Sequence, residues 1–467
     1  MRRPNRRPTY LKTEDIENYE IPPDYLVYKD GEVTIAVNGD TGEEDSRNTD
    51  SFTVIQYAVN NGNHVHIKGG TYTMTDQLVL NDNNVVSGSG PETILKLDAM
   101  TNTNIFYATG KSNITIKDLA LDGNKAAQNA AWGHKVGGDE SKNNNIYFVG
   151  CTGCQILHIT TYNSTNNLIL LYNGCTECLT DGCIAYGADW HGIEYWMDVA
   201  NSTICNCIAR DCYVQPIVVE LGTTHDCSIV NNIVSDDGSA KASADGILVQ
   251  SCTKALVANN TCEEVRIRIV NTTFSDIIGN RVTIQNIELA VDSDNNNIVG
   301  NYLYDQAGHG ISISSDKNNI VGNYIYSTGA NAIYLAGDSD KNNVVGNYII
   351  DSVNGIIEDG TGNYNNISDN YFENTSPEVT IVGANTIVRH NYGYVTENSG
   401  TATMLNAGSS IVVAHGLAAT PTVINVTGQH AEVLDLHVGT IGAANFTITT
   451  VGAVSADRAI FWEAKVR

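Results

Sequence analysis

Carboxylate and aromatic residues gather near the middle of the sequence at spacings that suit carbohydrate chemistry. Glu194 and Trp196 lie two residues apart, and Glu220 follows Trp196 after 24 residues. A pair of carboxyl groups can act as acid and base on a glycosidic bond, and an aromatic ring can pack on the CH face of a sugar. This chemistry requires a fold that brings the three residues onto one surface.

A repeat in the second half of the sequence predicts such a fold. The phrase KNNIVGNYIYS from Lys317 has close copies that start at Asn295, Lys341 and Tyr364. Each copy alternates apolar and polar residues and then turns through Gly, Asn or Asp, which is typical of strands. Short strands with a period of 22 to 24 residues predict an all-β protein built as a right-handed parallel β-helix. We expect about ten coils between residues 65 and 395.

The repeat also places an asparagine at the same corner of each coil. Stacked identical amides can form hydrogen-bonded ladders along the helix axis, and Asn tolerates the left-handed backbone of a tight corner. The equivalent residues are Asn301, Asn323, Asn347 and Asn370.

Aligning the coils separates inward from outward side chains in the first strand of each turn. An isoleucine recurs at the inward position, from Ile146 through Ile193 and Ile217 to Ile333. Positions one and three residues after it then point outward. They include Tyr172, Glu194, Trp196, Glu220, Gln250 and Arg268. Aromatic rings beside acids and amides on a long flat face suit a polysaccharide, although a merely solvated sheet face is the alternative.

The alignment keeps three classes of function open. Glu194 and Glu220 project from adjacent coils with Cα atoms about 8 Å apart, which suits the acid and base of a glycoside hydrolase. A non-catalytic adhesin would use the same face for binding alone. The third class rests on a resemblance that a short motif carries.

The charge composition limits the classes of partner that the chain can bind. The 467 residues include 52 acidic and 26 basic side chains, for a net charge of −26. This balance argues against nucleic acid as a partner. No apolar stretch is long enough to span a membrane, and the start, MRRPNRRP, lacks the apolar core of a secretory signal. We interpret residues 1–23 as a basic, disordered arm.

Different elements are expected at the two ends of the solenoid. Residues 24–64 read as two short strands and a helix that starts at Asp50 and ends at Gly62, and this helix would cover the open end of residues 65–395. The order of a capping helix followed by a Gly-x-Tyr strand resembles the pectin-lyase-like superfamily. Residues 396–467 have short strands at the spacing of a small β-sandwich.

The string Tyr186-Gly-Ala-Asp189-Trp-His191 closes a coil just before Glu194. It resembles the Tyr-Gly-Phe-Asp-Pro-His motif of alginate C5-mannuronan epimerases and related β-helix lyases. Leu121-Asp-Gly-Asn124 and Lys135-Val-Gly-Gly-Asp139 resemble two further strings of that family. The resemblance spans roughly residues 50 to 395 as a fold, and Ala188 and Trp190 depart from the motif.

The resemblance implies an enzyme that removes the C5 proton of a uronate. In that case Lys135 and Asp189 bind and neutralise the uronate carboxylate, while His191 and Tyr186 transfer protons. Lyase and epimerase share this first step, so the sequence leaves both open.

Metal sites are a further question. Cys151-x-x-Cys154 and Cys175-x-x-Cys178 match a zinc spacing, but each cysteine lies 24 residues from its counterpart, which predicts small buried side chains stacked in register.

Calcium would suit an acidic face that holds a polyanion. The aspartates at the coil corners are interpreted as turn residues, so no metal site is assigned. They are Asp292, Asp294, Asp316 and Asp338.

The last segment carries a second resemblance. Val413-Ala-His415-Gly-Leu417, followed by Thr420-Pro421, resembles C-terminal domains of phage tail and tailspike proteins. The resemblance implies a homotrimer that is virion-associated or extracellular. We interpret His415 as a turn residue rather than a ligand.

Overall fold

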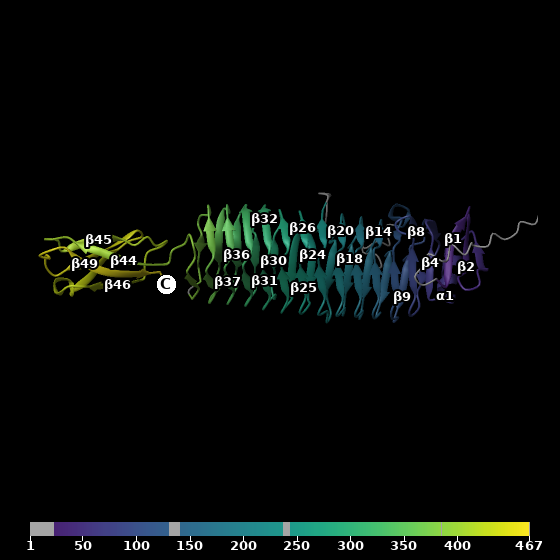
Figure 1. Cartoon of the computed structure of the whole chain (residues 1–467), viewed down its shortest axis with the longest axis horizontal. Coiled ribbons are helices and arrows are strands. Elements are labelled where there is room, and N and C mark those ends of the chain that lie inside the picture. The colour runs from purple at the N-terminus through teal and green to yellow at the C-terminus, as the bar shows by residue number, and fades with distance from the viewer. Residues whose placement is uncertain (1–22, 130–140, 237–242, 384, 467) are drawn as a thin grey trace, which may run out of the picture. The chain divides into compact units, whose positions relative to one another are not determined.

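The computed structural model describes residues 23–129, 141–236, 243–383 and 385–466. These residues form a right-handed parallel β-solenoid of about 13 turns, followed by two small antiparallel sheets (Figure 1). The predicted fold class is confirmed, whereas the expected number of about ten coils is wrong. The 331 residues from 65 to 395, divided by the period of 22 to 24 residues, already give about 14 turns, so the expected ten was too few for this length. The predicted arm, residues 1–23, lies outside the described residues except for Pro23.

The chain divides into two compact units, residues 1–283 and 284–467. The first unit begins with an antiparallel hairpin, β1 (Tyr25–Asp30) and β2 (Val33–Asn38), and a further strand, β3 (Glu44–Asn48). Strand β1 also pairs in parallel with the first solenoid strand, β4 (His64–Ile67). The hairpin therefore covers one edge of the first coil.

Helix α1 (Ser51–Asn61) follows, as predicted. Its N-cap is Asp50, whose carboxylate accepts a hydrogen bond from the backbone N–H of Thr53, and its apolar face buries Val54, Ile55 and Val59. No helix in the described ranges is long and apolar enough to cross a membrane.

Three parallel sheets make up the solenoid of the first unit, and each coil contributes one strand to each sheet. Sheet A contains β4, β7 (Val85–Gly88), β10 (Thr115–Lys117), β13 (Gln155–Leu157), β16 (Leu179–Asp181), β19 (Thr203–Cys205), β22 (Ser228–Val230), β25 (Leu256–Ala258) and β28 (Asp276–Ile278). Sheet B contains β5 (Gly70–Met74), β8 (Thr93–Leu97), β11 (Ala120–Asp122), β14 (Thr160–Tyr162), β17 (Ile184–Tyr186), β20 (Ile208–Arg210), β23 (Ile233–Ser235), β26 (Thr261–Glu263) and β29 (Arg281–Thr283). Sheet C contains β6 (Leu78–Val79), β9 (Phe106–Thr109), β12 (Ile146–Val149), β15 (Ile169–Tyr172), β18 (Ile193–Trp196), β21 (Ile217–Glu220), β24 (Asp245–Gln250) and β27 (Arg266–Val270).

The inward isoleucines form the core column that the alignment predicted. Ile193 pairs with Ile169 on one side and with Ile217 on the other, and all three are fully buried. Each coil therefore buries its apolar side chains against the coils before and after it, which is how a solenoid is stabilised.

The cysteines also stack between coils. The backbone N–H of Cys151 donates to the sulfur of Cys175 at 3.4 Å, and Cys178 contacts the carbonyl of Cys151 at 3.8 Å. All the cysteines are free thiols. This arrangement fits small side chains packed in register.

The second unit continues with the same three kinds of strand. Its solenoid strands are β30 (Ile287–Leu289), β31 (Asn297–Val299), β32 (Tyr302–Gln306), β33 (Ile311–Ile313), β34 (Asn319–Val321), β35 (Tyr324–Thr328), β36 (Asn331–Ala336), β37 (Asn343–Val345), β38 (Tyr348–Ile350), β39 (Asn354–Asp359), β40 (Asn366–Ser368), β41 (Tyr371–Glu373), β42 (Val379–Thr380) and β43 (Ile387–Arg389).

The asparagine ladder lies in this unit. Asn347 Nδ2 donates to Asn370 Oδ1 at 2.9 Å, and Asn323 Nδ2 donates to Asn347 Oδ1 at 2.9 Å. The left-handed backbone belongs to the residue before each ladder position, for example Gly322 (φ 63°) and Gly346 (φ 65°). The expectation that Asn itself adopts this conformation is therefore wrong at these corners, because the preceding glycine does so without a Cβ clash.

The C-terminal segment folds as two three-stranded antiparallel sheets. One contains β44 (Glu397–Met404), β49 (Arg458–Lys465) and β46 (Val423–Gly428), and the other contains β45 (Ser410–Ala414), β48 (Asn445–Thr450) and β47 (Leu436–Ile441). Phe446 and Trp462 meet edge to face in their shared core, with ring centroids 5.7 Å apart. His415 is buried, accepts a hydrogen bond from the backbone N–H of Leu417 and contacts the carbonyl of Gly442 at 3.1 Å, so it serves the turn.

Candidate functional site

A row of aromatic side chains crosses the outer face of sheet C in the first unit. Tyr107, Tyr147, Tyr172 and Trp196 come from four successive strands, β9, β12, β15 and β18. Neighbouring ring centroids along the row are 5.8, 6.1 and 4.8 Å apart. The row changes column between β12 and β15, because Tyr147 pairs with Leu170 and Tyr172 pairs with Val149. It therefore runs obliquely across the face.

Polar residues continue the column beyond Trp196. Trp196 pairs with Glu220 of β21, and Glu220 pairs with Gln250 of β24. The structure therefore brings Tyr172, Trp196, Glu220 and Gln250 onto one column of one face. Arg268 lies in the neighbouring outward column, opposite Leu248.

Side chains in the middle of that neighbouring column are buried rather than exposed to solvent. Glu194 pairs with Leu170 and with Val218, and all three side chains are almost completely buried although they point away from the core. The expectation of a solvent-facing Glu194 is therefore wrong. Burial of a carboxyl group without a compensating partner is costly, so its immediate neighbour matters.

The neighbour of Glu194 is His191. His191 Nε2 lies 3.8 Å from Glu194 Oε1, and the two side chains are only 5% and 4% exposed. The ring of Trp190 packs on the imidazole with centroids 4.7 Å apart. The result is a buried His–carboxylate pair whose glutamate belongs to β18, the strand that also carries Trp196.

The position of His191 is fixed by a second asparagine ladder. Asn104 Oδ1 accepts from the backbone N–H of Asn144, Asn144 Oδ1 accepts from Asn167, and Asn167 Oδ1 accepts from His191, at 3.0 to 3.1 Å. His191 is the next position of this ladder, where an imidazole takes the place of the amide.

A second buried carboxylate lies two coils further on. Asp245 is 2% exposed and contacts Gln215 Nε2 at 3.4 Å, Arg266 Nε, and Arg268 Nη1 at 3.8 Å. Sequence reasoning selected Arg268 but missed Asp245, Gln215 and Arg266. A bulge between Asp245 and Ile247 shifts the register there, and the alternation pattern does not reveal it.

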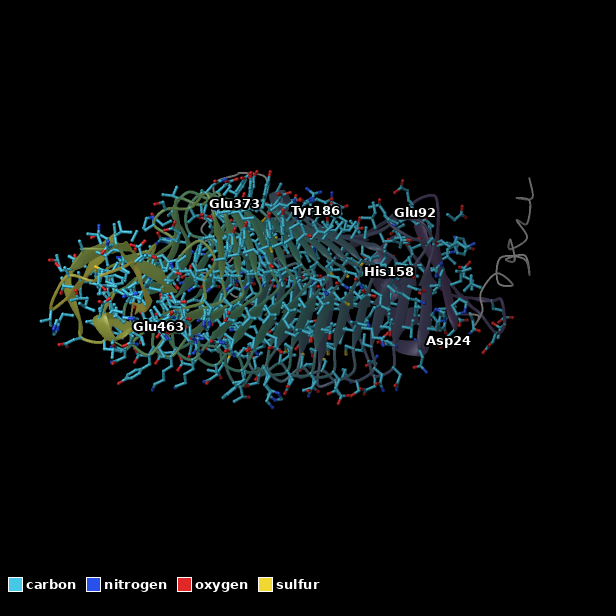
Figure 2. All side chains as sticks on the ribbon, turned by 60° about the vertical axis from the view of Figure 1, so that its left-hand side comes forward. Asp24, Glu92, His158, Tyr186, Glu373 and Glu463 are labelled. Carbon is cyan, nitrogen blue, oxygen red and sulfur yellow. The ribbon has the colours of Figure 1, made fainter. Side chains whose placement is uncertain are left out.

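Tyr186 and Asp189 make different contacts. Tyr186 ends β17 of sheet B, its ring stacks on Tyr162 at 5.3 Å, and the Arg210 guanidinium lies 5.0 Å from it. Tyr186 lies at the periphery of the solenoid (Figure 2). The structure thus places Tyr186 on sheet B, whereas Glu194 and Trp196 lie on sheet C.

The cation beside Asp189 is Lys125. Its ammonium contacts Asp189 Oδ1 at 3.2 Å and donates to the carbonyl of Gly187 at 2.8 Å. Lys135, for which the family resemblance implies this role, lies outside the described residues. Lys125 belongs to the short 3₁₀ helix Lys125–Ala127 that directly follows the Leu121-Asp-Gly-Asn124 string.

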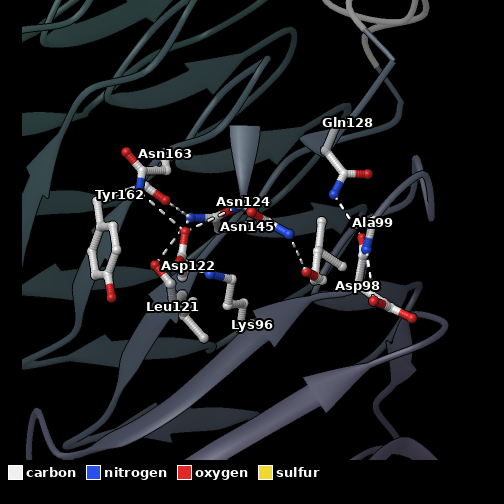
Figure 3. A network of polar contacts seen from close by, with 11 residues as sticks. Lys96, Asp98, Ala99, Leu121, Asp122, Asn124, Gln128, Asn145, Tyr162 and Asn163 are labelled. Carbon is white, nitrogen blue, oxygen red and sulfur yellow. Dashed lines mark hydrogen bonds and ion pairs between the residues drawn. The ribbon is translucent and has the colours of Figure 1, made fainter. Parts of the chain in front are cut away.

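The Leu121-Asp-Gly-Asn124 string itself forms a polar network (Figure 3). The Asp122 carboxylate accepts from the backbone N–H of Asn124 at 2.9 Å and from Asn163 at 3.2 Å, and it forms an ion pair with Lys96 at 3.3 Å. Asn124 is left-handed (φ 48°) and donates to the carbonyl of Leu97. These contacts hold the turn that presents Lys125.

The aspartates considered for calcium lie in the second unit. They line a pocket of about 480 Å³. Two of them are used by the backbone, because Asp294 Oδ1 accepts from the N–H of Asp316, and Asp316 Oδ1 accepts from the N–H of Asp340, both at 2.8 Å. Within the described ranges no group of three or more His, Cys, Asp or Glu side chains is arranged to hold a metal ion.

Known proteins share the solenoid. The tailspike protein of E. coli bacteriophage HK620, solved with a pentasaccharide, matches 90% of this chain and 90% of its own length with 12% identity and a TM-score of 0.54. Gene product 12 of bacteriophage phi29, in its pre-mature form, matches 74% of this chain with 16% identity and a TM-score of 0.57, and the match spans about half (55%) of that protein. At these identities the likeness shows the fold alone, and it confirms the predicted right-handed parallel β-helix.

Two further matches are weaker in structural similarity or shorter in extent. The A-module of mannuronan C-5 epimerase AlgE6 from Azotobacter vinelandii matches 72% of this chain and 93% of its own length with 15% identity and a TM-score of 0.43. Residues 219–407 match the family model described as periplasmic copper-binding protein (NosD), which covers less than half of the chain. Comparison with curated protein sequences gives no significant match.

Proposed function

We propose that the chain is an enzyme that removes the C5 proton from a uronate residue of an alginate-like polysaccharide on the outer face of sheet C. The observation that carries this proposal is the buried pair of His191 and Glu194, 3.8 Å apart, beside the aromatic row. A histidine next to a carboxylate is a standard arrangement for a general base, because the carboxylate orients the imidazole and stabilises its protonated form.

The proposed reaction begins at the C5–H bond. His191 accepts the proton, and the electron pair of that bond moves into the neighbouring C6 carboxyl group to give an enolate. Burial around His191 and Glu194 keeps competing water away and strengthens their electrostatic interaction. Glu194 is a positioning residue in this scheme.

The enolate needs a positive charge close to the substrate carboxyl group. Lys125 is held at Asp189, two residues before His191 in the same turn. This cation supports the role that the family resemblance implies for Lys135, which stays a prediction. Arg266 and Arg268 add positive charge further along the face, and both contact Asp245.

Two products can follow from the enolate. Return of a proton to C5 from the opposite face gives the epimer. Departure of the C4 oxygen with its bonding pair, protonated as it leaves, gives a C4–C5 double bond and a cleaved chain. Tyr186 stays the predicted proton donor, and Tyr186→Phe tests it by removing only the hydroxyl group.

A glycoside hydrolase is the second candidate, because Glu194 is a buried carboxyl group with Glu220 diagonally opposite on the next strand. Neighbouring strands and a two-residue offset place their Cα atoms about 8 Å apart, within the range that inverting enzymes use between carboxyl groups. In that mechanism Glu194 protonates the leaving oxygen and Glu220 activates water.

One experiment separates these classes. The protein is incubated with alginate, pectate and neutral glycans while ultraviolet absorbance of unsaturated uronate, reducing ends and the proton NMR spectrum are followed. The uronate mechanism predicts unsaturation, or a changed ratio of mannuronate to guluronate without chain shortening, and His191→Ala abolishes either. Reducing ends without unsaturation, lost in Glu220→Gln, would establish the hydrolase, and binding without any product would establish an adhesin.

We also propose that the chain forms a homotrimer in a virion-associated or extracellular particle. The C-terminal segment exposes large apolar side chains on its strands (Val412 and Phe461) and in its connections (Leu434 and Val451), and such surfaces are common at subunit contacts. Light scattering on the intact chain should give three times the chain mass, and a chain truncated after Asn391 should be monomeric. A monomeric intact chain contradicts the trimer.

A further inference from the structure

A pocket of about 410 Å³ lies at the N-terminal end of the aromatic row. Tyr107 and Tyr147 form its aromatic wall, and its polar lining residues include Gln77 and Lys142. The two rings are the first members of the row that leads through Tyr172 to Trp196. The pocket is therefore continuous with the face that carries the proposed reaction.

The amide of Gln77 is held in one orientation. Its Oε1 accepts hydrogen bonds from Thr103 Oγ1 at 3.3 Å and from Asn104 Nδ2 at 3.2 Å. Asn104 is fixed in turn, because it donates to the carbonyl of Ser141 at 2.9 Å and accepts from the backbone of Asn144. Both lone pairs of the Gln77 oxygen are thus used, so the side chain offers its NH₂ group as the donor.

These groups favour one class of ligand. An ammonium and an amide N–H are donors, and a carboxylate is the acceptor that they bind most strongly. The two tyrosine rings suit the CH face of a pyranose. On a chain of net charge −26, a lysine at the end of the proposed substrate track gives a polyanion a local positive charge to bind.

We propose that this pocket is a distal subsite that binds a uronate residue of the same polysaccharide, with Lys142 and Gln77 contacting its carboxylate. The inference rests on the proposed function of the His191–Glu194 site. Tyr107 and Trp196 lie three strands apart along the axis and two residues apart along the strand, which separates their Cα atoms by about 16 Å. Only an oligosaccharide longer than two or three residues can occupy both places.

The test compares oligomannuronates of two lengths. Calorimetry on the full-length protein, carrying His191→Asn to prevent turnover, measures the affinity for a trisaccharide and an octasaccharide. Lys142→Gln should weaken binding of the octasaccharide about tenfold, the scale of one charge-assisted contact, and leave the trisaccharide unchanged. Lys111→Gln, at an exposed ion pair with Asp82, is the matched control. Gln77→Ala should act in the same direction as Lys142→Gln.

Three results would overturn the inference. If Lys142→Gln and Gln77→Ala bind the octasaccharide as the parent does while the wild-type protein still turns over alginate, the pocket is no subsite and the proposed function stands. If Lys142→Gln weakens binding of a carboxyl-reduced octasaccharide by the same factor, the pocket does not recognise a carboxylate. If no uronate binds or reacts with any form of the protein, both proposals fall together.

Discussion

Asn167 Oδ1 accepts a hydrogen bond from the backbone N–H of His191 at 3.1 Å. The same contact joins Asn104 to Asn144 and Asn144 to Asn167 in the preceding coils. His191 thus occupies a position whose backbone is fixed by the ladder, while its side chain is free to differ from the asparagines before it. The contact with Asn167 uses the backbone of His191, so it does not require an imidazole side chain.

This relationship predicts the behaviour of His191→Asn. An asparagine at this position restores the side-chain type of the ladder, so the variant should fold with a thermal midpoint close to that of the wild type. Loss of the base should lower turnover of alginate by about 100-fold or more, the usual contribution of a general base. Thermal unfolding and product assays on the same preparations measure both effects.

His191→Ala is the companion variant. It removes the base and also leaves a cavity beside Glu194 and Trp190, so it should lose both activity and stability. Full activity in His191→Asn would remove His191 from the mechanism.

Trp196 should contribute to binding. Its ring packs on Tyr172 with centroids 4.8 Å apart and continues the track along sheet C. Trp196→Ala should weaken oligosaccharide binding by roughly 1 to 3 kcal/mol, the scale of losing an aromatic contact. Tyr348→Ala removes an aromatic side chain that is 52% exposed in the second unit and should leave the affinity unchanged. Equal losses in the two variants would place the glycan elsewhere.

Much of the fold is predictable from the sequence because period and alternation are local properties of the chain. The inward isoleucines pair in the predicted register, and Tyr172, Trp196, Glu220 and Gln250 fall on one column. Burial of Glu194 was not predictable in this way, because it depends on contacts made from outside the strand, such as that of His191 at 3.8 Å.

Contacts between distant turns were the hardest part of the site to predict. Lys125 meets Asp189 although 64 residues separate them, since intervening coils of unequal length decide which turns lie together. Asp245 was missed for a related reason, because a bulge moves it out of the alternating pattern. His191, Gln215 and Asp245 each lie two residues before the inward isoleucine of their coil, the position that Asn144 and Asn167 hold in earlier coils. A search for departures from asparagine at this position would have selected all three.

The asparagine ladder of the second unit should be a main source of its stability. Asn347 is fully buried, donates to the carbonyl of Ile320 at 2.9 Å and accepts from the backbone N–H of Asn323 at 2.9 Å. Asn347→Ala leaves both groups buried without a partner, which should cost roughly 2 to 4 kcal/mol in unfolding free energy. Chemical unfolding measures the loss.

The control is Asn319→Ala. Asn319 donates to Asn297 Oδ1 at 2.9 Å in an exposed ladder, where water can replace the contact. Its substitution should change stability by about 0.5 kcal/mol or less. A similar loss in the two variants would show that burial of the ladder is unimportant.

His66 should make stability depend on pH. Burial lowers its pKa to about 4, and nearby His64 and Lys68 act in the same direction. The folded state therefore disfavours the charged imidazole, while the unfolded chain takes up the proton near the ordinary pKa of 6.5. Stability is unaffected above that value and falls as pH drops from 6.5 towards about 4, by up to about 3 kcal/mol.

Unfolding midpoints across this pH interval, compared between the wild type and His66→Gln, test the effect. The stability of His66→Gln should fall less steeply with decreasing pH than that of the wild type. His158→Gln, at a side chain that is 62% exposed, should keep the wild-type slope of stability against pH. Parallel curves for the wild type and His66→Gln would contradict the assignment to His66.

The most direct test of the central claim is the fate of the C5 proton. Alginate is incubated with the protein in deuterated water, and the C5–H signals of its uronate residues are followed by proton NMR, with His191→Asn as the control. Both the epimerase and the lyase remove this proton, so the account predicts that the wild type loses the C5–H signal, by deuterium incorporation or by formation of the double bond, and that His191→Asn does not. Retention of every C5 proton while the chain is shortened, or while nothing changes, would contradict it.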